Sequence, residues 1–360
     1  MKAPRRVLVI ATRRIGDVLL TTPLLRSLRQ AWPHAEIDVL VFEHTEGVLL
    51  HNPDINRVIT VPARPGFWKH LGLVSRLFRR YDLAISTLTG DRPTLYAWLA
   101  GKVRIGMVED GSKQSWKQHM LSRWAAFDNL NIHTVLMNLK LADLLGIARS
   151  HEVVVSWNSS DEERVVSALP FDIRSEVFAV LHVYPKFAYK MWRQENWAEL
   201  ARWLKENGMR VILTGGNFPD ELAYVDEVYR TLPDGAVNMA GKLGIAESAF
   251  LASRARIYVG PDTMLTHVAA AVGTPTIALF GPSNPVKWGP WPRGYAEDRN
   301  PYRMKGTQRV NNVVLLQGGG DCVPCMHEGC ERHIASLSDC LQNLPVASVI
   351  AEIQQLTGQH

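Results

Sequence analysis

The sequence lacks several features that would place it in a common functional class. No stretch of about 18 uncharged apolar residues occurs in the 360 residues, which excludes a membrane-spanning helix. The pattern G-x-x-x-x-G-K-[ST] is absent and no G-x-G-x-x-G follows the first strand-like run, which argues against P-loop enzymes and dinucleotide-dependent dehydrogenases. The apolar run at residues 7–11 is too short for a secretion signal. We therefore expect a cytoplasmic protein.

Acidic residues are scarce in the first part of the chain. Residues 1–150 contain 21 Lys and Arg against 12 Asp and Glu, a net charge of +9. Residues 151–360 contain 19 against 23, a net charge of −4. The basic part suggests an anionic partner, such as nucleic acid, acidic lipid or a phosphorylated glycan. A solvated surface without a partner is the alternative.

The hydrophobic pattern predicts two successive α/β domains. An apolar run at 7–11, helical spacing over 18–32 and a second apolar run at 37–41 form a β-α-β unit, which implies a parallel sheet. Further strands are expected at 57–61, 83–86, 177–182, 211–214, 255–260 and 274–280, and further helices at 71–81, 134–145, 196–207 and 263–272. We predict an α/β fold of two Rossmann-like, doubly wound parallel sheets. Its parts would be domain 1–168, domain 169–345 with a Cys-rich segment at 318–340, and a C-terminal helix at 346–360.

The loop after the first strand contains a candidate catalytic carboxylate. Ligands of doubly wound sheets bind at the carboxyl ends of the strands. The first such loop reads Arg13-Arg14-Ile15-Gly16-Asp17, in which Gly16 would permit a tight turn and Asp17 would lie at or near the helix start. Asp17 either caps this helix or is placed beside two arginines to accept a proton. The motif alone leaves both alternatives open.

A second candidate site follows the strand predicted at 255–260. Asp262 and Thr263 stand where a helix begins, and the backbone N–H groups and positive dipole of that helix end would bind a diphosphate. Lys190 follows an earlier strand of the same domain and would neutralise a phosphate without a metal. Structural roles remain as alternatives: a helix cap at Asp262, a solvated lysine, and a core histidine at His267.

The four cysteines lie within one short segment. Their order is Cys322-x2-Cys325-x4-Cys330-x9-Cys340. Disulfides are disfavoured in the cytoplasm, and a C-x2-C pair with two further cysteines is typical of a four-thiolate site for zinc or iron. His327 and His333 are further candidate ligands. We expect a structural zinc or iron ion here, and reduced free cysteines are the alternative.

Two segments carry a resemblance to a known family. Residues 14–29 (RIGDVLLTTPLLRSLR), continued by Pro33 and residues 37–41, look like the N-terminal signature of the family nine glycosyltransferases, the heptosyltransferases. Residues 260–267 and 275–285 look like the donor-site signature of the same family. Together they make the resemblance run nearly from end to end. Residues 288–291 and 190–192 look more like the branch that adds the third heptose.

The resemblance implies a GT-B fold, with an N-terminal acceptor domain and a C-terminal nucleotide-sugar domain that face a central cleft. It implies inverting transfer of a heptose from ADP-heptose to the lipopolysaccharide inner core, with no cofactor for catalysis. Asp17 would be the general base. A carboxylate is a weak base for an alcohol, so proton transfer would be concerted with attack.

The resemblance also implies roles on the donor and acceptor sides. Lys190 and the helix end at Asp262 and Thr263 would stabilise charge on the leaving diphosphate, His267 would line the same pocket, and Gly215 and Gly216 would lie near the nucleotide. Arg13, Arg14, Gly16 and Arg64 are the candidate acceptor-binding residues. The segment after His182 departs from the family, because residues 183–186 (VYPK) replace a Pro-Gly-Ala turn, so local donor contacts are not carried over.

The basic domain then has an interpretation as a surface for the anionic acceptor and for the cytoplasmic face of the inner membrane. Arg64, Lys69, Arg79 and Arg80 are the residues expected to make this peripheral contact. Three other functions remain: a GT-B transferase with another nucleotide sugar or a protein or O-glycan acceptor, a sugar-nucleotide epimerase, and a zinc-containing nucleic-acid binder. The cysteines lie in the acidic part and no basic-aromatic interleaving accompanies them, so we expect no nucleic-acid partner.

Overall fold

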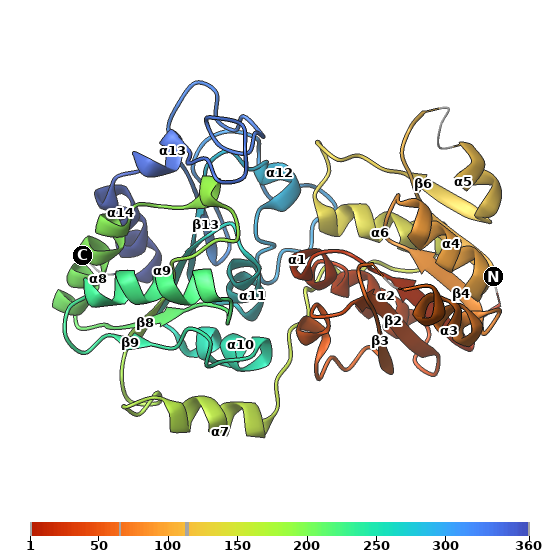
Figure 1. Ribbon diagram of the computed structural model, residues 1–360, viewed down its shortest axis with the longest axis horizontal. Coiled ribbons are helices and arrows are strands. Elements are labelled where there is room, and N and C mark those ends of the chain that lie inside the picture. The colour runs from red at the N-terminus through yellow and green to blue at the C-terminus, as the bar shows by residue number, and fades with distance from the viewer. Residues whose placement is uncertain (1, 65, 112–114, 359–360) are drawn as a thin grey trace. The chain divides into compact units, whose positions relative to one another are not determined.

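The computed structural model describes residues 2–64, 66–111 and 115–358, without the side chains of residues 67–70. The chain divides into two compact units (Figure 1). The first runs to Ser156 and includes Ala296–Asn300, and the second comprises Trp157–Tyr295 and the chain from Pro301 onward. Among the described residues, no helix combines the length and apolarity needed to cross a bilayer.

The first unit is built on a six-stranded sheet in which all strands are parallel, in the order β3-β2-β1-β4-β5-β6. Its strands are β1 (Arg6–Ile10), β2 (Glu36–Phe42), β3 (Arg57–Val61), β4 (Tyr81–Ser86), β5 (Gly101–Val108) and β6 (Arg123–Ala126). Its helices are α1 (Ile15–Leu19), α2 (Thr22–Ala31), the 3-10 helix η1 (Glu46–Leu49), α3 (Phe67–Leu77), α4 (Asp91–Ala100), α5 (Ser115–Met120) and α6 (Thr134–Leu145). This strand order is that of a doubly wound sheet.

The second unit repeats this arrangement with a seven-stranded sheet, in the order β12-β13-β11-β10-β7-β8-β9. Only the β12–β13 pair among these strands is antiparallel. The strands are β7 (Phe178–His182), β8 (Arg210–Thr214), β9 (Val237–Asn238), β10 (Ile257–Pro261), β11 (Thr276–Phe280), β12 (Gln308–Val310) and β13 (Val313–Gln317). The helices are α7 (Ser159–Ala168), the 3-10 helix η3 (Ala188–Lys190), α8 (Gln194–Glu206), α9 (Pro219–Arg230), α10 (Ile245–Arg254), α11 (Met264–Val272), α12 (Pro285–Trp288), α13 (Asp339–Gln342) and α14 (Val346–Thr357). The prediction of two doubly wound α/β sheets is confirmed.

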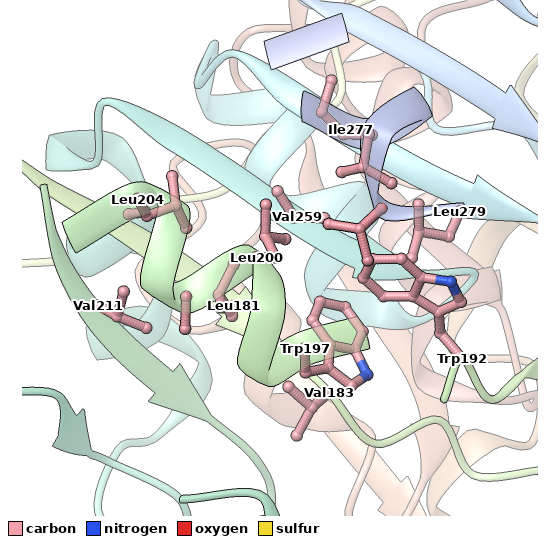
Figure 2. Close-up of a cluster of buried hydrophobic side chains, with 14 of the residues drawn as sticks. Leu181, Val183, Trp192, Trp197, Leu200, Leu204, Val211, Val259, Ile277 and Leu279 are labelled. Atoms are coloured by element: carbon pink, nitrogen blue, oxygen red, sulfur yellow. The ribbon is translucent and has the colours of Figure 1, made fainter. Parts of the chain in front are cut away.

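A core cluster of the second unit lies between its sheet and the helices α8, α9 and α14. Figure 2 shows Trp197 and Leu200 of α8 pointing toward strand side chains that include Leu181 and Val259. The rings of Trp192 and Trp197 meet edge to face with their centroids 4.9 Å apart. Removal of one such indole costs about 3–5 kcal/mol of stability. Trp192 therefore anchors the loop between β7 and α8.

Three bounds differ from those predicted. The helix expected over 18–32 is two helices, α1 and α2, because the chain breaks at Leu20 and Thr21 ahead of Pro23 at the start of α2. The domain boundary predicted after residue 168 falls after Ser156 instead, because α7 packs on α10. The predicted C-terminal helix ends at Thr357, where Gly358 adopts a left-handed φ of 68°, and residues 359–360 lie outside the described part.

Candidate functional site

The candidate donor residues follow two neighbouring strands of the second sheet, at the point where the strand order reverses direction. In the second sheet β7 and β10 are neighbours, and β8 and β11 follow them on opposite sides. A crevice forms at the carboxyl ends of such strands and is the usual ligand site of this fold. Lys190 follows β7 and Asp262 follows β10. The sequence-predicted donor residues therefore meet at this edge.

Lys190 and Asp262 form an ion pair. Nζ of Lys190 donates to Oδ2 of Asp262 at 2.5 Å and to its backbone oxygen at 3.3 Å. The two side chains are 18% and 9% exposed. The alternative of a solvated lysine is wrong, because Asp262 draws Lys190 into the site.

The charge of Asp262 is held by its neighbours. Burial raises the pKa of its carboxyl, but the positive charge of Lys190, an electrostatic interaction with His267 and hydrogen bonds from Lys190 and Ser283 outweigh burial and leave the pKa below its ordinary value. Asp262 is thus ionised at neutral pH. Ser283, on the loop after β11, was not selected as a site residue from the sequence.

His267 is buried in α11, one turn after the start of the helix. Its Nε2 lies 4.0 Å from Oδ1 of Asp262, and its Nδ1 is buried without a hydrogen-bond partner among the described residues. Burial lowers its pKa to about 4, although Asp262 acts in the opposite direction and Lys190 in the same one. The imidazole is therefore neutral at pH 7. An unpartnered buried nitrogen suggests a ligand contact more than a core packing role.

The first turn of α11 points its backbone N–H groups to the same edge. Thr263 occupies the N-cap position, and its hydroxyl hydrogen-bonds to the Thr266 hydroxyl at 3.2 Å and not to a first-turn N–H. The expected alternative of an N-cap at Asp262 is therefore wrong by one residue. The helix end carries positive partial charge and is suited to an anion such as a diphosphate.

The Gly215-Gly216 loop after β8 is organised by a carboxylate. Oε1 of Glu221 accepts a hydrogen bond from the Gly216 N–H at 2.6 Å. A Cβ on Gly216 would lie 2.8 Å from Oε2 of Glu221, so glycine permits this close approach. Burial raises the pKa of Glu221 despite the Gly216 hydrogen bond. Glu221 was not selected from the sequence, although it lies only five residues after Gly216, because α9 was not predicted.

His182 ends β7 beside the same loop. Its Nδ1 lies 3.3 Å from the Thr214 hydroxyl of β8, the residue before Gly215. Burial lowers the pKa of His182 to about 4, and the Thr214 hydrogen bond only partly opposes this. A second neutral histidine therefore lies at the carboxyl edge of the sheet.

In the first unit, Asp17 lies in the first turn of α1, at the carboxyl end of β1. The N-cap of that helix is Arg14, so the alternative of Asp17 as the cap is wrong. Nη1 of Arg13 lies 3.4 Å from Oδ1 of Asp17, whose side chain is 15% exposed. The predicted tight turn at Gly16 is also wrong, because Gly16 lies inside α1 and is not among the glycines with positive φ.

Other polar residues gather at the carboxyl edge of the first sheet. Arg14 and Arg64 are exposed, and Arg64 lies on the loop after β3. On the other side of β1, Thr89 donates to Oε1 of Glu109 at 2.8 Å. The buried Lys117 donates to the Thr89 backbone oxygen at 2.6 Å and pairs with Asp91 at 2.7 Å. This group carries no signal in the sequence, because its members come from α4, α5 and the loops after β4 and β5.

All four cysteines are free thiols. As the side chains stand, no three His, Cys, Asp or Glu residues within 2–64, 66–111 and 115–358 are arranged as the ligands of a metal ion. The predicted structural metal therefore stays a prediction that rests on the grouping of the thiols.

Comparison with known proteins identifies the family. The sequence pattern of glycosyltransferase family 9 (heptosyltransferase) matches residues 71–313. The chain belongs to glycosyltransferase family 9. It is 30% identical over 292 residues to lipopolysaccharide heptosyltransferase 3 of Escherichia coli strain K12, which covers 77% of this chain and 82% of that protein. The protein is thus an enzyme, a glycosyltransferase, as the resemblance implied.

Solved structures show the same fold. The family 9 glycosyl transferase of Veillonella parvula DSM 2008 superposes with a TM-score of 0.80 at 20% identity, over 100% of this chain and 99% of that one. The E. coli ADP-heptose lipopolysaccharide heptosyltransferase II gives 0.73 at 21% identity, over 98% and 99%. The predicted GT-B fold is confirmed. Family membership favours neither the epimerase nor the nucleic-acid binder.

Proposed function

We propose that this enzyme transfers a heptose from ADP-heptose to the inner core of lipopolysaccharide with inversion at the anomeric carbon. The observation that carries the proposal is the Lys190–Asp262 ion pair beside the first turn of α11, in a member of a heptosyltransferase family. The names of the two E. coli relatives support the donor and the acceptor.

The second unit supplies charge stabilisation for the departing ADP. The Lys190 ammonium and the N–H groups of α11 would meet the diphosphate, and their charge matters most as the bond from the anomeric carbon to the phosphate oxygen breaks. Asp262 holds Lys190 in place and can also accept hydrogen bonds from sugar hydroxyls. His267, neutral and with an unpartnered Nδ1, would contribute a polar contact without added charge. No metal is needed for these roles.

The first unit supplies the base and the acceptor contacts. Asp17 would take the proton of the acceptor hydroxyl as its oxygen attacks the anomeric carbon, and the electron pair of the broken bond leaves with ADP. The Arg13 guanidinium, 3.4 Å from the Asp17 carboxylate, would hold that carboxylate in place. Arg13, Arg14 and Arg64 together would present positive charge to a phosphorylated acceptor. Similarity to heptosyltransferase 3 favours an acceptor that already carries two heptoses.

We further propose that the first unit contacts the cytoplasmic face of the inner membrane. Of the basic residues predicted for this role, Arg79 and Arg80 follow α3 and are exposed, whereas the side chain of Lys69 lies outside the described part. Phe78 and Trp98 beside them are 56% and 43% exposed. The Arg79 N–H donates to the Leu99 oxygen at 2.9 Å, which joins the end of α3 to α4.

Helix α4 also lines an apolar pocket of about 290 Å³, formed by Arg92, Leu95, Tyr96, Trp98 and Leu99. Aromatic and aliphatic side chains flanked by arginines fit an anionic lipid interface, where each basic residue contributes about 1 kcal/mol. This surface would hold the enzyme close to its membrane-anchored acceptor.

A transfer assay with an acceptor series tests the function. Purified enzyme is incubated with ADP-heptose and lipopolysaccharides bearing zero, one or two heptoses, and products are followed by mass spectrometry. We expect one heptose to be added to the acceptor with two. Addition to a different acceptor would change the assigned position of the added heptose, but the reaction would still be heptose transfer. Transfer from another nucleotide sugar, and none from ADP-heptose, would overturn the donor.

A further inference from the structure

The four cysteines lie near one another, close to the loop that carries Ser283. Cys340 lies in α13, where a Cβ on Gly281 would come within 2.9 Å of its Sγ. The Gly318 N–H donates to the Phe280 oxygen at 2.8 Å, and a Cβ on Gly318 would come within 2.1 Å of the Cys340 backbone oxygen. Cys340 therefore packs directly against the turn that follows β11.

Backbone hydrogen bonds bring the other cysteines to the same place. The N–H of Met326, next to Cys325, donates to the Pro282 oxygen at 2.9 Å. Sγ of Cys330 accepts a hydrogen bond from the N–H of Asp339, the neighbour of Cys340, at 3.4 Å. Cys322, Cys325 and Cys330 are all close enough to Cys340 to interact with it electrostatically.

This grouping has the chemistry of a thiolate metal site. The segment between β13 and α13 contains no helix or strand in the described residues 318–338, and it is shaped by turns with backbone hydrogen bonds such as that from Cys330 to Leu337. A tetrahedral ion with four Cys ligands would fix such a segment, as it does in small metal-bound modules. Backbone N–H groups directed at sulfur, as at Cys330, stabilise thiolates at such sites.

We propose that Cys322, Cys325, Cys330 and Cys340 together bind a thiophilic ion, zinc or iron, that clamps the segment 318–338 against the Gly281–Ser283 turn. Each thiol releases its proton to solvent on binding, and no redox step is needed. The side chains do not converge as ligands in the present arrangement, so binding draws the sulfur atoms together.

The clamp has a consequence for the donor site, and this part rests on the proposed function. Ser283 hydrogen-bonds to Asp262, and Asp262 holds Lys190. A fixed Gly281–Ser283 turn keeps this pair in place for the diphosphate. The ion itself takes no part in transfer, and the four cysteines act as positioning residues through Ser283.

The test measures metal in the whole enzyme, purified without a histidine tag under reducing conditions. Elemental analysis is expected to give about one zinc or iron ion per chain. Iron would show thiolate charge-transfer absorption in the visible range. Zinc would be colourless, and replacement by cobalt(II) would give the visible bands of a tetrahedral thiolate site. A folded enzyme that contains almost no metal and takes up none from zinc(II) or iron(II) overturns the proposal.

Variants identify the ligands. Cys325→Ser and Cys330→Ser are expected to lose the ion, whereas His327→Ala and His333→Ala keep it; loss in a histidine variant and retention in both cysteine variants would contradict the assignment. His333 is a matched control, because its Nε2 already pairs with Glu331 at 2.8 Å.

ADP binding by calorimetry then separates the two proposals. Cys325→Ser should weaken ADP binding several-fold, and addition of metal should not restore it. If the wild-type enzyme contains the metal but Cys325→Ser binds ADP as tightly as the wild type, the clamp is refuted and the metal site is not. Bound metal in an enzyme that transfers no heptose would refute the proposed function and leave the metal site standing.

Discussion

Lys190 Nζ lies 2.5 Å from Oδ2 of Asp262, and neither residue would be stable here without the other. Asp262 is 9% exposed, and a buried carboxylate without a partner costs several kcal/mol. The pair joins the loop after β7 to the loop after β10, the two neighbouring strands at which the sheet changes direction. Stability and the proposed binding of diphosphate are thus coupled in one contact.

Lys190→Met is expected to lower kcat/KM by about 10²- to 10³-fold, because the leaving diphosphate loses its ammonium. It should also destabilise the fold, since Asp262 is left unpaired. The double variant Lys190→Met/Asp262→Asn should recover stability and not activity. Steady-state kinetics and thermal unfolding measure both effects.

Lys186→Met is the control for Lys190, because Lys186 is an exposed lysine of the same loop. It should leave kcat/KM within about two-fold of the wild type. Equal losses from both substitutions would mean that the loop, and not the ammonium of Lys190, accounts for the effect.

Glu221→Ala should weaken ADP binding by about five- to ten-fold, since the Gly216 N–H loses its acceptor and the loop after β8 loosens. Glu221→Gln keeps an acceptor oxygen and should retain most of the affinity. Calorimetric titration with ADP gives both values, with the exposed Glu206→Ala as control. A loss in Glu221→Gln as large as in Glu221→Ala would show that the charge, and not the hydrogen bond, is required.

Burial of His182 should make stability depend on pH. Its pKa falls from 6.5 to about 4 on folding, so the unfolded chain binds the proton more readily. The contribution of neutral His182 to stability is fully present above pH 6.5 and is lost as pH falls toward 4. Between pH 7 and pH 5 this loss is about 2 kcal/mol.

In His182→Leu the difference in unfolding free energy between pH 7 and pH 5 should therefore shrink by about 2 kcal/mol relative to the wild type. Urea unfolding at the two pH values measures it. An unchanged difference would mean that His182 titrates normally in the folded protein.

Binding to anionic vesicles should fall as salt rises, and Arg79→Glu should weaken it by about ten-fold or less. Trp98→Ser should weaken binding even at high salt, since its contribution is apolar. Vesicle sedimentation with phosphatidylglycerol and phosphatidylcholine lipids measures both. Phe218→Ser in the second unit is the control, because Phe218 is 71% exposed but lies on the other unit. Binding that depends on neither salt nor Trp98 would refute the membrane surface.

Local patterns predicted the elements with strong local signals. The strand at 57–61 and the helix at 134–145 have the predicted bounds, the latter because Gly146 adopts the left-handed conformation that ends a helix. The strand β5 and the helices α4, α9 and α10 were missed. In β5, Lys102 and Arg104 interrupt the apolar run, so its burial depends on neighbours distant in sequence.

The same distinction holds for the site. Asp17, Lys190 and Asp262 lie in the segments that follow strands β1, β7 and β10, and their motifs could be recognised in the sequence. Glu221 lies only five residues after Gly216 and was missed because α9 was not predicted. Ser283 reaches the site only through the fold, because Ser283 and its partner Asp262 come from loops after different strands. Sequence spacing carries no signal for such contacts.

The measurement that tests the central claim most directly compares wild type and Asp17→Asn on lipopolysaccharide with two heptoses. We expect the wild type to transfer one heptose from ADP-heptose to this acceptor. Asp17→Asn should lower kcat by about 10²- to 10⁴-fold while ADP still binds. The exposed Glu36→Ala is the control, with activity unchanged. Transfer at the wild-type rate by Asp17→Asn, or no heptose added to any acceptor by the wild type, would contradict it.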